Sequence, residues 1–197
     1  MFCYQCQETM KNTGCTRRGM CGKSAEVARL QDLLIYLLKG ISFWGTRARP
    51  MDIKDDETDL FVAKALFATI TNANFDSDRF VALIKEAIER RDDLRKRAQT
   101  RCNELHNSNC TGGGPDWAGW HPENYEVETL LAKGRTVGVM DDPELNEDIR
   151  SMREVVIYGL KGIAAYVDHA YLVGGRDESI LAFMQEALEA TTNDKLG

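Results

Sequence analysis

The chain has 197 residues, 43% of them hydrophobic, which is enough to bury a core in one ordinary domain or two small ones. Its formal net charge of -6 and pI near 5.2 argue against nucleic acid or an anionic membrane as a partner, since both attract basic surfaces. No run of eighteen apolar residues occurs, and the first thirty residues lack an apolar stretch that could form a signal-peptide core. We therefore expect a cytoplasmic protein that neither enters a membrane nor binds nucleic acid.

The N-terminal segment holds four of the six cysteines, in the pattern Cys3-x2-Cys6-x8-Cys15-x5-Cys21. Without a secretory signal, this clustering indicates metal ligation in a reducing compartment rather than disulfides. A C-x2-C pair lets two thiolates converge from one turn, and two more from a glycine-containing loop can complete four ligands. The spacing has neither the second C-x2-C pair of zinc knuckles nor the tighter gaps of bacterial ferredoxins. It favours an iron–sulfur cluster, with zinc as the main alternative and unligated cysteines as the third.

The same segment is a basic island on an acidic protein, because residues 1–23 carry a balance of +3. Its charged side chains are Lys11, Arg17, Arg18 and Lys23 against Glu8. Positive surroundings favour thiolate over thiol and stabilise an anionic metal–thiolate centre, although on charge alone a chance grouping of basic residues is an equal alternative.

Helical periodicity follows the cysteine segment. Ser24 is expected to cap a helix whose apolar residues recur at three- and four-residue steps as far as Trp44. A second helix fits residues 57–72. Asp76 can cap a third, in which residues 89–101 read as a solvated charged extension. Three helices in sequence suggest an antiparallel bundle.

Residues 107–122 break the pattern with glycines and Pro115, which predicts a loop or linker. Trp117 and Trp120 in this loop are expected to fold back over the bundle rather than to form a docking surface. A short helix near residues 125–132 follows. Helical periodicity then resumes from about Asn146 and again from Asp177.

An internal duplication links the two halves of the chain. Residues 35–41 (IYLLKGI) match residues 157–163 (IYGLKGI), and residues 65–69 match residues 187–191 at the same offset of 122 positions. The counterpart of the third helix would begin beyond Gly197, so the second bundle is expected to lack it. The apolar face this leaves would need cover from downstream sequence, a partner copy or the first bundle.

These patterns together predict an all-α fold. It consists of two repeated antiparallel three-helix bundles, the second truncated, preceded by a Cys-rich cluster-binding segment. The predicted divisions are a cluster-binding segment at 1–23, a first bundle at 24–105, an irregular linker at 106–145 and an incomplete second bundle at 146–197. Cys102 and Cys110 lie near His106, where a second metal site is conceivable but free thiols are favoured.

The cysteine segment resembles the start of the hybrid-cluster proteins, also called prismane proteins or hydroxylamine reductases. The similar stretches are Met1–Thr9, Asn12–Thr16, Gly19–Lys23, Leu30–Leu34, Leu66–Asn74 and Gly159–Tyr166. The resemblance covers essentially the whole chain and is weakest across residues 103–146.

The resemblance implies that this helical region is the first of three domains and that Cys3, Cys6, Cys15 and Cys21 hold a 4Fe-4S cluster. Relatives with wider cysteine spacing carry 2Fe-2S. It also implies that the hybrid iron–sulfur–oxygen cluster, where hydroxylamine or nitric oxide is reduced, is ligated by later domains absent here. The chain would then relay electrons from a redox donor protein and would itself lack catalytic residues.

Three further expectations complete this interpretation. Partners would be the redox donor protein and either the remaining domains of the same polypeptide or another subunit copy. Positive charge from Lys11, Arg17 and Arg18 should stabilise the reduced cluster. The alternatives are a standalone small iron–sulfur electron carrier or redox sensor, and a structural zinc-binding helical module.

Overall fold

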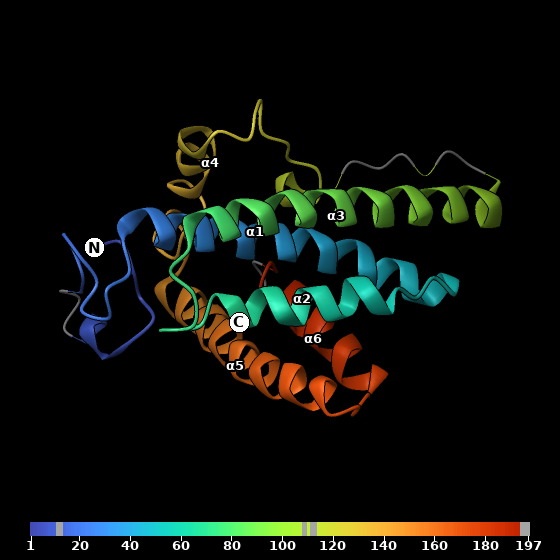
Figure 1. Ribbon diagram of the computed structural model, residues 1–197. Helices are drawn as coiled ribbons and strands as arrows, with labels where there is room; N and C mark the ends of the chain where they lie inside the picture. Colours follow the sequence, from blue (N-terminus) through green and yellow to red (C-terminus); the bar gives the residue numbers. More distant parts are fainter. Residues whose placement is uncertain (11–13, 108–109, 111–113, 194–197) are drawn as a thin grey trace.

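The computed structural model describes residues 1–10, 14–107, 110 and 114–193, and within them it is all-helical with no β-strand (Figure 1). The α-helices are α1 Ala25–Ala48, α2 Asp56–Ala68, α3 Ser77–His106, α4 Val127–Gly134, α5 Glu147–Leu172 and α6 Glu178–Ala190. The predicted all-α class is therefore confirmed. None of the helices in this described part is long and apolar enough to cross a membrane.

Side-chain caps start the helices where the sequence predicted. The Ser24 hydroxyl accepts a 3.1 Å hydrogen bond from the Val27 amide at the start of α1. Asp76, Asn146 and Asp177 cap α3, α5 and α6 in the same way. Helix α2 ends at Ala68, four residues earlier than expected. The chain turns away there, because the Thr69 hydroxyl donates back to the Leu66 carbonyl and Asn72 adopts a left-handed conformation.

The helices interleave the two halves of the chain. Helix α3 packs along α1, and α6 packs on another side of α1. Helix α2 packs more extensively against α5 and α6 than against α1. The helices of the two predicted bundles therefore pack against one another, as Figure 1 shows for α2, α5 and α6. The boundaries of the predicted domains stay a prediction.

The loop after α3 closes over the core. The indole Nε1 of Trp44 donates a 2.9 Å hydrogen bond to the Ala118 carbonyl. Trp117 and Trp120 pack against the buried cluster of apolar side chains. The expectation that these tryptophans fold back over the helices is confirmed.

The charged stretch at residues 89–101 is a solvated extension on one side only, and the prediction was wrong for the other side. Arg91, Leu94 and Ala98 are buried there. Helix α3 continues along α1, and the backbone of Trp117 lies over the same region as Arg91. Burial is possible because the Arg91 guanidinium donates a 2.9 Å hydrogen bond to Asp92.

Large apolar side chains of α5 and α6 are exposed, although the apolar periodicity from about Asn146 predicts a buried stripe on that helix. Met152, in that stripe, is 64% exposed. The other large apolar side chains exposed on these two helices are Val155, Val156, Tyr158, Tyr166, Leu172, Ile180 and Phe183, with Val173 directly after α5. These two helices therefore hold most of the large apolar side chains that are exposed in the described part of the chain.

Candidate metal centre

The cysteine segment precedes α1 and lies at one end of the helices (Figure 1). It is anchored by Phe2, which is only 7% exposed. The Phe2 amide donates a 3.0 Å hydrogen bond to the Cys15 carbonyl, and Cys3 and Cys15 form an isolated antiparallel bridge. Two of the four predicted ligands thus face each other on neighbouring stretches of extended backbone.

Two glycines shape the loop around Cys21. The Gly19 amide donates to the Lys23 carbonyl at 2.8 Å, and a Cβ at position 19 would lie 2.8 Å from that oxygen. Gly22 has a φ of +95°, a conformation that L side chains rarely adopt. Substitution at either position would therefore strain the loop that carries Cys21.

The donor set suits a soft metal or cluster. Cys3, Cys6, Cys15 and Cys21 are all free and partly buried. The Met20 amide already donates to the Cys15 sulfur at 3.4 Å, a contact of the kind that tunes iron–sulfur centres. Across the described residues, however, no three His, Cys, Asp or Glu side chains gather closely enough to hold a metal ion. The four-cysteine ligand set therefore stays a prediction, and the chemistry of its sulfurs fits.

Gln5, inside the C-x2-C turn, is hydrogen-bonded to two helices, α1 and α5, and to the turn after α2. Its carbonyl accepts hydrogen bonds from the Tyr158 hydroxyl of α5, at 2.7 Å, and from the Thr71 hydroxyl just after α2, at 3.2 Å. Its side-chain amide donates to Gln31 of α1 at 3.3 Å. The position of Cys3 and Cys6 is thus set by tertiary contacts.

The basic island is divided between buried and exposed side chains. Lys23 is 1% exposed, and its ammonium donates a 2.6 Å hydrogen bond to the Gln31 carbonyl oxygen Oε1. Arg17 and Arg18 are exposed, and Lys11 lies outside the described residues. Among the described cations of this island, Lys23 therefore carries the charge that solvent screens least.

The expectation of free thiols at Cys102 and Cys110 was wrong, because a disulfide joins them. Asn107 ends α3 in a left-handed conformation and turns the chain back. The Cys110 amide then donates to the Asn103 side chain at 2.5 Å, and the two cysteine Cα atoms lie 6.0 Å apart.

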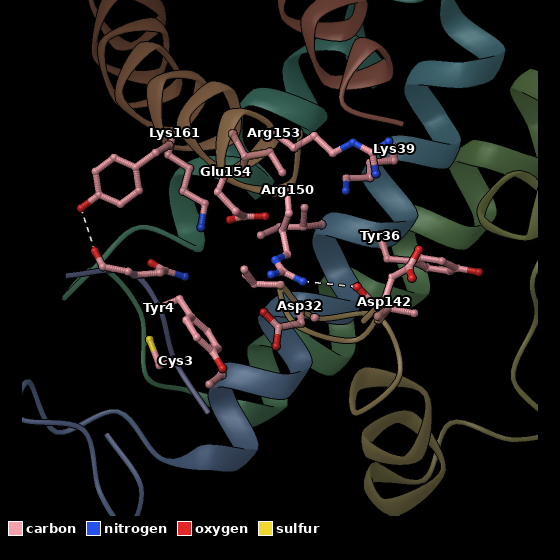
Figure 2. Close-up of a pocket in the computed structure, with 18 of the residues that line it drawn as sticks. Cys3, Tyr4, Asp32, Tyr36, Lys39, Asp142, Arg150, Arg153, Glu154 and Lys161 are labelled. Atoms are coloured by element: carbon pink, nitrogen blue, oxygen red, sulfur yellow. Dashed lines mark hydrogen bonds between the residues drawn. The ribbon is translucent and has the colours of Figure 1, made fainter. Parts of the chain in front are cut away.

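Sequence reasoning missed a group of buried and partly buried charges beside Cys3 (Figure 2). Asp32 and Lys39 of α1 face Glu154 and Lys161 of α5 across a shared cavity. Burial raises the pKa of Asp32 to about 7, against the opposing effect of Arg29. Burial lowers the pKa of Lys161 to about 8, although Glu154 acts the other way. The internal repeat could have pointed to this group, because it places Lys39 and Lys161 at equivalent positions.

Comparison with known proteins gives one consistent result. The model of the prismane/CO dehydrogenase family matches residues 1–197. Hydroxylamine reductases from Petrotoga mobilis, Halothermothrix orenii and Desulfitobacterium hafniense are 45%, 47% and 48% identical over 100% of this chain. The match covers 36%, 35% and 34% of those proteins, so the chain spans about a third of the length of these curated relatives.

Proposed function

The chain belongs to the prismane/CO dehydrogenase family, and from this premise we propose that it is the iron–sulfur electron-transfer domain of a hydroxylamine reductase. The observation that carries the proposal is the set of four free cysteines on one segment, fastened to the helices through Gln5. Because the relatives are about three times longer, the activity of a whole protein is part of the proposal.

In this proposal Cys3, Cys6, Cys15 and Cys21 hold a 4Fe-4S cluster. When bound, such a cluster supplies a centre that accepts and releases one electron at a time. The chain's own residues set its surroundings. The Met20 amide lies at the Cys15 sulfur, and the buried ammonium of Lys23 bonds Gln31, which also accepts from Gln5 of the C-x2-C turn. Both favour the more negative, reduced state.

The proposed role is a relay between a redox donor protein and the part of the relatives that this chain does not match. There, according to the family resemblance, a hybrid cluster reduces hydroxylamine or nitric oxide. The exposed apolar face of α5 and α6 fits this arrangement, because additional polypeptide of the same protein would bury it. The chain of residues 1–197 by itself should not reduce hydroxylamine. Turnover at a rate comparable with that of a hydroxylamine reductase of the relatives' length would contradict this.

Anaerobic purification tests the metal centre. We expect brown protein that contains iron and acid-labile sulfide in similar amounts. Serine at any one of the four cysteines should lower both contents, whereas Cys102→Ser, a cysteine outside the segment, should leave them unchanged. Colourless protein with stoichiometric zinc would support the structural zinc module instead. Oxygen-protected protein with neither iron nor sulfide would overturn the proposed function.

A further inference from the structure

A cavity of about 390 Å³ lies between the cysteine segment, α1, α5 and the loop before α5 (Figure 2). This is within the range of sites that bind small molecules. Tyr4 and Gln5 form part of one wall, and Gly138 and Asp142 belong to the loop on another side. The metal-centre proposal uses none of the charged side chains inside it.

The internal repeat builds the lining of this cavity. Every α1 residue that lines it has its counterpart, 122 positions later on α5, lining it too. The polar pairs are Asp32 with Glu154, Tyr36 with Tyr158, and Lys39 with Lys161. Equivalent side chains from the two copies therefore converge on one space.

Two lysines, Lys39 and Lys161, line this cavity. Lys161 is 3% exposed, and Figure 2 shows its ammonium group directed into the cavity. No hydrogen bond joins Lys39 or Lys161 to another of the side chains drawn there. The opposite charge that acts most strongly on both lysines is the carboxylate of Glu154, and neither ammonium group is hydrogen-bonded to it. Burial lowers the pKa of Lys39 as well as that of Lys161, which agrees with this picture.

The balance of charge around the lysines is positive. Arg150 and Arg153 also line the cavity, which makes four cationic side chains against the carboxylates of Asp32, Glu154 and Asp142. Asp142 is turned toward its own loop, where its carboxylate accepts from the Glu144 and Leu145 amides. Asp32 is paired with Arg29 at 3.3 Å. The seven charged side chains that line the cavity therefore sum formally to +1.

We propose that this cavity binds a small anion that bears several oxygen atoms, of the phosphate or carboxylate type, held between Lys39 and Lys161. Such a ligand offers acceptors to the two ammonium groups, and each charged hydrogen bond to it strengthens binding. The evidence for this anion site is the cavity and its lysines. Anion binding there goes beyond the proposed function, because it does not require the iron–sulfur cluster.

Titration calorimetry of the whole chain with inorganic phosphate, and separately with succinate, tests this site. Saturable binding of phosphate alone identifies a phosphate-type site, and binding of succinate alone identifies a carboxylate-type site. Lys39→Met and Lys161→Met should each weaken the preferred anion about tenfold or more. Lys64→Met, which removes an exposed lysine of α2, should leave binding unchanged.

Thermal unfolding guards against variants that merely misfold. The preferred anion should raise the Tm of the original chain and of Lys161→Arg, which keeps the charge, but not the Tm of Lys161→Met. The proposal is overturned by the absence of saturable binding for both anions. It is equally overturned if the lysine-to-methionine variants in the cavity bind as well as Lys64→Met.

Discussion

The Tyr158 hydroxyl on α5 donates a 2.7 Å hydrogen bond to the Gln5 carbonyl, 153 residues earlier in the chain. This bond holds the C-x2-C turn against a helix from the other half of the protein. It means that the proposed metal centre depends on α5 being folded and in place.

We expect Tyr158→Phe to loosen the cysteine segment. The loss of one hydrogen bond should cost about 1 kcal/mol of stability and should speed the loss of iron to a chelator. The matched control is Tyr166→Phe, since Tyr166 lies on the same helix and is 79% exposed. Iron release measured by absorbance should be faster only for the Tyr158 variant, and equal rates for both would contradict the anchoring role.

The buried charge of Lys23 should influence the proposed cluster more than the exposed arginines do. Lys23→Met should lower the midpoint potential, because a positive charge that stabilises the reduced state is removed. Arg17→Gln and Arg18→Gln should lower it less, because solvent screens exposed charges. Redox titration of the three variants decides the order, and a raised or unchanged value for Lys23→Met would refute the role.

The buried carboxyl of Asp32 should make stability depend on pH. Its pKa is raised to about 7 by burial, so the folded chain keeps this proton where the unfolded chain has lost it. Stability from this group is therefore present below pH 4 and is lost as the pH rises to about 7. Arg29, Lys161, Glu154 and Asp141 also act on this group.

Asp32→Asn removes the titration of this carboxyl, so the variant should lose less stability than the original chain between pH 4.5 and pH 7.5, by roughly 1–3 kcal/mol. Urea unfolding at the two pH values measures the difference. Asp148→Asn, at an exposed position on α5, should change both values alike. If the stability of Asp32→Asn depended on pH as that of the original chain does, the Asp32 carboxyl would have to be ionised in the folded protein.

Replacing a large side chain by alanine should cost more stability on the buried side of α6 than on its exposed side. Leu188 is 0% exposed, and Leu188→Ala should cost about 2–5 kcal/mol. Phe183 is 52% exposed, and Phe183→Ala should cost less than about 1 kcal/mol. Chemical unfolding of dilute protein compares them. Equal costs would mean that the apolar face is already covered in solution.

The disulfide between Cys102 and Cys110 closes a short loop after α3. In oxidised protein, peptide mapping without reduction should recover a linked pair of peptides. Cys102→Ser should lower stability by about 2 kcal/mol under these conditions and should have no such effect in the presence of reductant. An unlinked pair in fully oxidised protein would contradict this contact.

Much of the local structure followed from the sequence, because its causes are local. Ser24 and Asp76 cap the helices that they were expected to cap, since a capping side chain and an apolar stripe lie within a few residues of each other. The glycines at 19 and 22 likewise allow the sequence to predict that the backbone bends around Cys21, and it does so. The full-length family match supports the inference drawn from the cysteine spacing.

Only the tertiary structure decided which of these helices meet and which charges they bury. The charged stretch around Arg91 reads as solvent-facing, yet the loop after α3 covers it. The repeat places Lys39 and Lys161 at equivalent positions, but nothing in a linear pattern says that they share a cavity beside Cys3. Burial and charge depend on neighbours distant along the chain, and those neighbours exist only once α1 and α5 have packed.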